Sequence, residues 1–259
     1  MTTSIKQISN PKIKDPIVIE GLPGIGNVGK IAADFLVDSL KAKKIYEIHS
    51  SGFPHSVFIN EDNLVDLPKI EIYHKKRDKN DILLITGDIQ PLDEKSCYEF
   101  CDNVLDILEK NNAREIITLG GIGLPKAPKN PKVYSTGNNK DIIKKYKTKA
   151  LNTEIFGVVG PIIGVTGLLV GLAQQRNIDA IALLAQTFSH PTYLGIKGAK
   201  ELLAILDSKL NLKIDFKALD EEIKDIEKEV STNSQDLDKL QKTLKKSALP
   251  QKIDVNYIG

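Results

Sequence analysis

A glycine-rich segment has residue types and a spacing that could bind a ligand. Gly24, Gly26 and Gly29 are spaced as GxGxxG, follow the apolar run of residues 17–20 and precede a helical pattern. In a dinucleotide-binding unit, such glycines allow a tight turn and bring backbone N–H groups to a pyrophosphate. The candidate ligand-loop residues are therefore Gly24, Gly26, Asn27, Gly29 and Lys30.

Two nucleotide-binding patterns match this segment only in part. A dinucleotide site needs an acidic residue about 20 residues further on, at the end of the second strand. Glu47 is near that distance, but the apolar run there ends at His49. The P-loop pattern needs Ser or Thr after Lys30, and Ile31 cannot supply that Mg²⁺ ligand. A strand-to-helix turn that binds no ligand remains the structural alternative.

Other reactive side chains form no complete catalytic or metal-binding pattern. Cys97 and Cys101 stand four residues apart without a second Cys or His pair, so buried free thiols are expected. Ser189-His190 is a single pair without the third member of a triad. We therefore expect no catalytic residues, no metal and no cofactor. Lys126, Lys129 and Lys132 form a basic loop, either solvated or able to dock an acidic partner.

Composition excludes several classes of protein. The chain has 259 residues, 41% hydrophobic and 27% charged, and a net charge of +2. That balance, with Arg only at positions 77, 114 and 176, argues against nucleic-acid binding. Two cysteines and an N-terminal segment without an apolar signal region predict a cytoplasmic protein.

Residues 155–173 form a charge-free run long enough in principle to cross a membrane. Five glycines and Pro161 interrupt the run. We interpret it as a buried strand over residues 155–159 followed by a buried helix from Gly164, and we expect no membrane association. Gly164, Gly167 and Gly171 would share one helical face that another backbone can approach closely.

The hydrophobic pattern predicts strands that alternate with helices. Apolar or alternating runs predict strands at residues 17–20, 45–49, 70–74, 81–87, 115–119 and 180–184. A hairpin is expected around residues 60–63, and helices at residues 28–40, 93–111 and 199–210. The alternating strand at residues 70–74 suggests an exposed antiparallel or edge strand. The spacing as a whole predicts an α/β fold with a mostly parallel or mixed sheet covered on both faces.

The remaining residues suggest a helical arm and a tail. Aliphatic residues from Leu219 to Leu244 keep a 4,3 spacing with one polar member, Asn233. This register predicts a coiled-coil-like arm over residues 215–247, as one helix or a hairpin, and self-association. Pro250 ends the pattern, so residues 248–259 are predicted to be a flexible tail, after a core domain of residues 1–214. Val255, Tyr257, Ile258 and Gly259, with the terminal carboxylate, suit docking in a groove.

Three ordered segments resemble one protein family. They are Gly-Leu-Pro-Gly-Ile-Gly-Asn-Val-Gly-Lys at residues 21–30, Gly-Pro-Ile-Ile-Gly-Val-Thr-Gly-Leu-Leu at 160–169, and Ile-Ala-Leu-Leu-Ala-Gln-Thr at 181–187. Together they resemble the proteasome assembly chaperone family, in particular archaeal homologues of eukaryotic proteasome assembly chaperone 2. The resemblance implies a phosphorylase-like, three-layer α/β fold without an established catalytic site.

The resemblance also implies a homo-oligomer that binds α subunits of the 20S proteasome. Some members are thought to dock through a tail that ends in hydrophobic-Tyr-X; here Tyr257 is third from the end and follows Asn256. We expect a non-enzymatic chaperone or binding protein for 20S subunits or the assembled core particle. The alternative is a nucleotide- or nucleoside-binding enzyme that uses residues 24–30.

Overall fold

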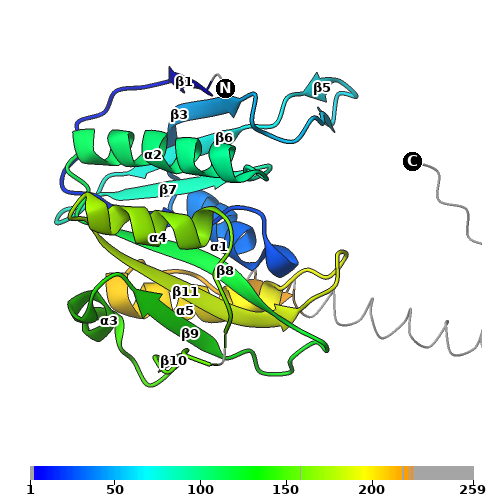
Figure 1. Cartoon of the computed structure of the whole chain (residues 1–259), viewed down its shortest axis with the longest axis vertical. Helices are drawn as coiled ribbons and strands as arrows, with labels where there is room; N and C mark the ends of the chain where they lie inside the picture. The colour runs from blue at the N-terminus through cyan, green and yellow to red at the C-terminus, as the bar shows by residue number, and fades with distance from the viewer. Residues whose placement is uncertain (1–2, 158, 218, 222, 224–259) are drawn as a thin grey trace, which may run out of the picture. The chain divides into compact units, whose positions relative to one another are not determined.

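The computed structural model describes residues 3–157, 159–217, 219–221 and 223 (Figure 1). The chain divides into two compact units, Met1–Asp215 and Phe216–Gly259. Most of the predicted arm and the whole predicted tail lie outside the described residues. The fold and the sites below belong to the first unit.

A nine-stranded mixed sheet forms the middle layer of the first unit, in the order β1-β3-β6-β7-β2-β8-β11-β9-β10. Its central strands β7, β2, β8 and β11 run parallel to one another, whereas β1, β6, β9 and β10 run the other way. The strands are β1 (Thr3–Gln7), β2 (Ile17–Glu20), β3 (Lys43–Ser50), β6 (Ile70–Lys75), β7 (Ile82–Gly87), β8 (Glu115–Leu124), β9 (Val133–Gly137), β10 (Leu151–Asn152) and β11 (Asp179–Phe188).

Helices cover both faces of this sheet, which confirms the three-layer α/β prediction. In Figure 1, α2 and α4 lie in front of the sheet, and α1 and α5 lie behind it. The α2 helix begins where the sequence predicts, because Asp93 accepts a hydrogen bond from the N–H of Ser96 at 3.0 Å. The helices are η1 (Ile25–Asn27), α1 (Val28–Ser39), α2 (Glu94–Lys110), α3 (Lys140–Tyr146), α4 (Val165–Gln175) and α5 (Ile196–Leu210).

Two predicted strands are longer than their apolar runs. The β8 strand continues through Gly120, Gly121 and Gly123 to Leu124, and β11 continues to Phe188. The two strands pair in parallel along their whole length, so ladder hydrogen bonds hold the glycine segment extended despite its low strand propensity. The predicted hairpin is confirmed as β4 (Phe58–Ile59) and β5 (Val65–Asp66), a separate two-stranded sheet.

One sequence prediction is wrong, and a second is confirmed in one of its two alternatives. The predicted strand at residues 155–159 is absent from the described residues 155–157 and 159: Gly157 has φ +78°, a conformation that breaks an extended run, and Phe156 is fully exposed. The β6 strand is antiparallel as predicted but is not at the edge, since β3 and β7 pair with its two sides.

The α4 helix that follows residues 155–164 is confirmed, and so is one close backbone approach on its glycine face. A Cβ on Gly167 would overlap the carbonyl oxygen of Ile162, whereas Gly171 has open space beside it. Among the described residues, no helix is both long enough and apolar enough to span a membrane.

Candidate functional site

The glycine-rich segment forms a sharp turn at the carboxyl end of β2, as the sequence predicts. One turn of 3₁₀ helix, η1, leads from the turn into α1. Gly26 and Asn27 adopt left-handed conformations with φ +62° and +51°. Glycine adopts this region without steric cost, and Asn tolerates it better than most residues.

Close packing accounts for two glycines of this turn and for one glycine of β8 beside it. A Cβ on Gly26 would come within 2.5 Å of the Thr187 hydroxyl oxygen in β11. Gly29 lies against the carbonyl group of Leu119, and Gly121 lies against the carbonyl oxygen of Ile25. The turn is therefore packed directly on β8 and β11, and these glycines are needed with or without a ligand.

The residues expected around a nucleotide are not brought together. The Nζ of Lys30 forms an ion pair of 2.8 Å with Asp34, one turn along α1. Glu47 lies in β3, which two strands, β6 and β7, separate from β2. In a dinucleotide-binding fold the corresponding strand lies next to the first one. Glu47 is thus not placed to bind a ribose at the turn, and the ligand-loop interpretation stays a prediction.

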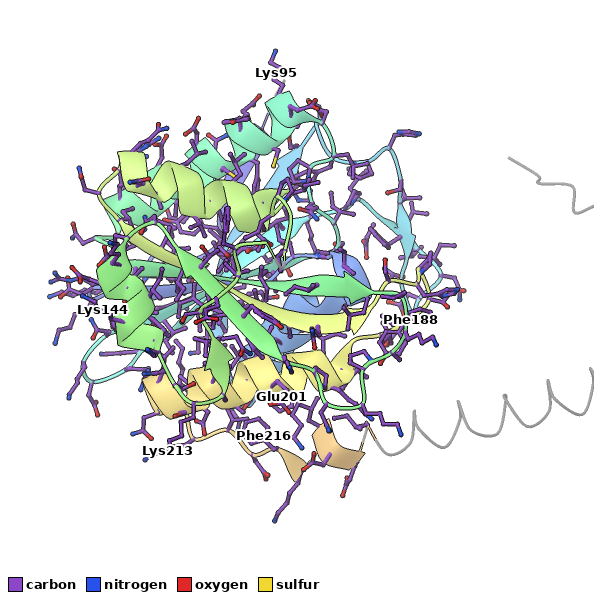
Figure 2. All side chains as sticks on the ribbon, turned by 60° about the horizontal axis from the view of Figure 1, so that its bottom comes forward. Lys95, Lys144, Phe188, Glu201, Lys213 and Phe216 are labelled. Atoms are coloured by element: carbon purple, nitrogen blue, oxygen red, sulfur yellow. The ribbon has the colours of Figure 1, made fainter. Side chains whose placement is uncertain are left out.

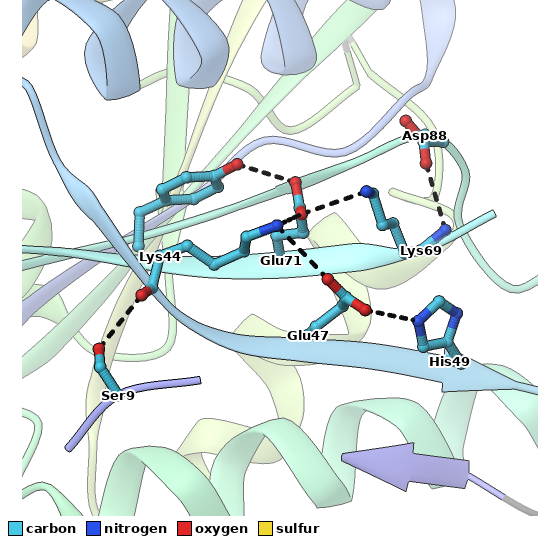
Figure 3. A network of polar contacts seen from close by, with 8 residues as sticks. Ser9, Lys44, Glu47, His49, Lys69, Glu71 and Asp88 are labelled. Atoms are coloured by element: carbon cyan, nitrogen blue, oxygen red, sulfur yellow. Dashed lines mark hydrogen bonds and ion pairs between the residues drawn. The ribbon is translucent and has the colours of Figure 1, made fainter. Parts of the chain in front are cut away.

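Glu47 instead belongs to a charged network on the β3–β6 surface (Figure 3). Lys44 reaches between two carboxylates, 2.6 Å from Glu71 and 3.4 Å from Glu47. The ring of His49 lies 3.0 Å from Glu47, and Tyr73 donates to Glu71 at 2.8 Å. The hydrogen bond to His49 and the nearby Lys44 hold the pKa of Glu47 below its usual value, although partial burial opposes this.

A small cavity of about 350 Å³ lies beside the turn. Gly24, Ile25, Gly26, Asn27, Ser189, His190, Pro191 and Tyr193 line it. The ring of Phe188, at the end of β11, stacks on His190 with centroids 5.4 Å apart and meets Tyr193 edge-on at 5.6 Å. Figure 2 shows Phe188 and Lys144 at opposite ends of the domain, so this aromatic cluster marks the carboxyl end of the parallel strands.

Gln90 ties the glycine turn to α4, a role that the sequence analysis missed. Its side-chain amide donates to the carbonyl oxygen of Pro23 at 2.7 Å and accepts from the N–H of Val165 at 3.2 Å. A Cβ on Gly164 would lie 2.5 Å from the same side-chain oxygen. Nothing in the local sequence distinguishes this glutamine from a surface residue.

Glu20 is a second residue whose role was missed. It ends β2 fully buried; its Oε1 accepts from the N–H of Leu22 at 3.1 Å, and Oε2 has no hydrogen-bond partner. Burial raises the pKa of Glu20 to about 8, although the Leu22 N–H and the nearby Thr166 hydroxyl counteract part of this. An acidic residue that directly follows the apolar run Ile17-Val-Ile was the available sequence signal.

The two cysteines are free and buried, as predicted. Cys97 and Cys101 lie on α2 in the core between the sheet and α4, near Glu20. Their mutual hydrogen bond and burial raise the pKa of Cys101. Cys97 also lines a groove of about 500 Å³ between the start of α2 and α4. This arrangement makes the pair part of the core packing.

The remaining candidate residues fall in two groups. Lys126, Lys129 and Lys132 are exposed on the loop between β8 and β9, as expected. Val255, Tyr257, Ile258 and Gly259 lie outside the described residues.

The architecture is that of a three-layer α/β protein whose glycine turn is a packing element. Residues 18–233 match the PAC2 family, and the chain belongs to this family.

Solved structures agree with this assignment. PbaB of Pyrococcus furiosus, described as an archaeal proteasome activator, is 36% identical with a TM-score of 0.83, covering 90% of this chain and 98% of that one. PbaA of the same organism, described as an archaeal homologue of proteasome-assembly chaperone, has a TM-score of 0.75 at 24% identity, covering 94% and 97%. At that identity PbaA supports the fold alone.

A sequence relative covers the whole chain. An uncharacterized protein of Methanocaldococcus jannaschii is 29% identical over 263 residues, covering 100% of this chain and 97% of that protein.

Proposed function

We propose that this protein is a non-enzymatic binding protein for the 20S proteasome, acting on its α subunits as an assembly chaperone or an activator. The observation that carries this proposal is the 36% identity to the proteasome activator PbaB over nearly the full length of both chains. A homo-oligomer in the cytoplasm, the compartment of the proteasome, is part of the same proposal.

The geometry of the glycine turn supports a binding role over nucleotide chemistry. The packing against Thr187, Leu119 and Ile25 accounts for Gly26, Gly29 and Gly121. Lys30, the residue that would reach phosphates, is engaged with Asp34. The turn therefore fixes the start of α1 against β8 and β11, and its glycines and Lys30 are accounted for without a bound nucleotide.

Docking through the tail is the specific mode that we propose. The alternation of Ile253, Val255 and Tyr257 suits an extended segment whose side chains enter pockets on one face of a groove. Tyr257 offers a ring to bury and a hydroxyl that can hydrogen-bond, which makes it a suitable anchor, with Ile258 and Gly259 beside it.

Co-purification with proteasome α subunits tests the proposal as a whole. The full-length protein should retain the α subunits, and deletion of residues 257–259 should abolish or strongly weaken retention at an unchanged oligomer mass. Lys126→Gln/Lys129→Gln/Lys132→Gln serves as the matched control and should bind as the wild type. Binding that survives the deletion but not the lysine substitutions would assign docking to the loop instead. No binding by any form would reject the proposal.

Self-association through the predicted helical arm is a separate part of the proposal. Aliphatic residues from Leu219 to Leu244 at alternating spacings of four and three suit a helix–helix seam between copies. Truncation before Asp215 should lower the oligomer mass in light scattering. An unchanged mass would show that the arm is not an interface between copies.

A further inference from the structure

The described residues expose large apolar side chains almost entirely at one end of the sheet. Apart from Ile5 and Ile8 near the N-terminus, they lie in segments that follow the carboxyl ends of β2, β3, β7 and β11, in the segment that leads into α4, or in the second turn of α2. These side chains are Ile25, the residues Val57, Phe58, Ile59, Leu64, Val65 and Leu67 in and beside the hairpin, and Leu92, Tyr98, Phe156, Ile163 and Leu194. We call this surface the carboxyl-end face.

The β4–β5 hairpin forms one flank of this face. It projects beyond the main sheet between β3 and β6 (Figure 1). Asn60 builds its turn by accepting hydrogen bonds from the N–H groups of Asp62 and Leu64 at 3.1 and 3.0 Å. Yet Ile59 is 73% exposed and Val65 67% exposed. A lone two-stranded hairpin is marginal in water, so this flank suits a covering partner.

The segment that leads into α4 adds further uncovered side chains to this face. Phe156 is fully exposed and Ile163 is 86% exposed, both in the segment that leads into α4. Exposed apolar side chains that gather on one face mark interaction sites.

Charge divides the two flanks of the face. The hairpin segment between Val57 and Leu67 carries Glu61, Asp62 and Asp66 and no cation. The opposite flank is the loop of residues 124–132 between β8 and β9, whose lysines alternate with Leu, Ala and Pro. Strands β7 and β2 lie between these flanks in the sheet. One flank of this chain therefore complements the other in both charge and apolar character.

We propose that the carboxyl-end face binds a second copy of this chain about a twofold axis, with the hairpin of each copy against the lysine loop of the other. A twofold axis in the plane of the contact exchanges the two flanks, so each acidic hairpin meets one basic loop and the dimer contains two such contacts. The exposed apolar side chains of the two faces then cover each other. This interface is separate from the predicted arm and independent of proteasome binding.

Paired charge reversals test this arrangement in the full-length protein. One variant is Glu61→Lys/Asp62→Lys and the other is Lys126→Glu/Lys129→Glu. Each variant alone places like charges at both hairpin–loop contacts of the dimer. It should therefore lower the oligomer mass in light scattering about twofold. An equimolar mixture of the two variants pairs opposite charges at both contacts and should recover the wild-type mass.

Controls separate this contact from general charge effects. Lys76→Glu/Lys79→Glu makes the same charge change as the loop variant at the amino end of β7 and should keep the wild-type mass. Phe156→Ser/Ile163→Ser should lower the mass without changing the far-ultraviolet circular dichroism, since both side chains are exposed. A wild-type mass for the charge-reversed variants, or a mixture that fails to recover it, would overturn the proposal. Retention of proteasome α subunits by these variants is measured separately and does not bear on it.

Discussion

Gly29 in α1 packs against the carbonyl group of Leu119 in β8 so closely that a Cβ would overlap the oxygen and lie 2.9 Å from the carbon. Neither atom can move without displacing a helix or a central strand. This contact sets how near α1 lies to the sheet. Close packing thus requires a glycine at position 29 of the GxGxxG segment. It does not require one at position 24, because Gly24 has nothing within 4 Å of its Cβ position.

Gly29→Ala should therefore destabilise the domain. Alanine normally stabilises a helix interior relative to glycine, but here overlap with Leu119 should lower the free energy of unfolding by roughly 1–3 kcal/mol. Gly24→Ala is the matched control; with φ −161° it is extended and should change stability by less than about 0.5 kcal/mol. Urea unfolding of both variants gives the comparison. Equal losses would contradict the packing explanation.

The periodic parts of this fold could be predicted from the sequence. The continuous apolar runs of β2 and β7 and the helical spacing of α1 and α2 follow directly from burial on one or both faces. The segments that the sequence did not predict correctly have no such pattern. The β1 strand is largely exposed and exists because it pairs with β3, and residues 155–159 look like a strand only if Gly157 is ignored.

The candidate site was less predictable than the fold. The position of the glycine turn between β2 and α1 was foreseen, because that context is local. Its packing partners Thr187 and Leu119 are far away in sequence, so the reason for the glycines needs the tertiary structure. The same holds for Gln90, whose partners are Pro23 and Val165.

The buried carboxyl of Glu20 predicts an unusual pH dependence of stability. Its pKa is raised from 4.5 to about 8, so between these values the folded state keeps a proton that the unfolded state loses. Stability is therefore lost as pH rises through this window and levels off above it. Glu20→Gln keeps the shape of the side chain but cannot ionise. Between pH 5 and pH 9, its free energy of unfolding should rise relative to that of the wild type by up to roughly 5 kcal/mol.

Denaturant unfolding of the wild type and Glu20→Gln at pH 5, 7 and 9 measures this difference. The two proteins should have similar stability at pH 5 and diverge with rising pH. Parallel stability curves would show that Glu20 ionises normally in the folded state.

The buried carboxylate of Asp81 predicts a pH dependence of stability opposite to that of Glu20. It is buried, its carboxylate accepts from the N–H groups of Lys14 and Arg77 at 3.0 and 2.9 Å, and it lies 2.8 Å from the His74 ring. Burial alone raises the pKa of Asp81, but the Arg77 N–H, His74 and the Lys14 N–H together lower it. The ionised Asp81 carboxylate therefore stabilises the folded state. This stabilisation is fully present above the ordinary Asp pKa and is lost as pH falls through the lower pKa of the folded state.

Asp81→Asn should therefore destabilise the protein by roughly 3 kcal/mol at neutral pH and by less in acid. Asp78→Asn, an exposed carboxyl in the same turn, is the control and should have little effect. Thermal melts at pH 7 and pH 3 compare them. A loss that stays constant with pH would mean that the charge of Asp81 is not what holds this turn.

Glu71 allows the contribution of the β3–β6 network to be measured against a surface ion pair. Its side chain is 13% exposed, 2.6 Å from the Lys44 ammonium, and accepts from the Tyr73 hydroxyl at 2.8 Å. Burial raises the pKa of Glu71, but the hydrogen bonds from Lys44 and Tyr73 bring it below the usual value on balance. The network therefore stabilises the fold near neutral pH and weakens as Glu71 is protonated in acid.

Glu71→Gln should lower the free energy of unfolding by roughly 1–2 kcal/mol at neutral pH, because a charged hydrogen-bond acceptor is lost from a mostly buried position. The control is Asp141→Asn, whose carboxyl is 91% exposed and 3.5 Å from Lys144. Such an exposed pair should contribute less than about 0.5 kcal/mol.

Urea unfolding at low and high salt compares the two substitutions. The Glu71 loss should persist in high salt, since Lys44 and Glu71 are partly shielded from solvent. If the two losses are equal, or if salt removes both, the β3–β6 network is no stronger than a surface pair.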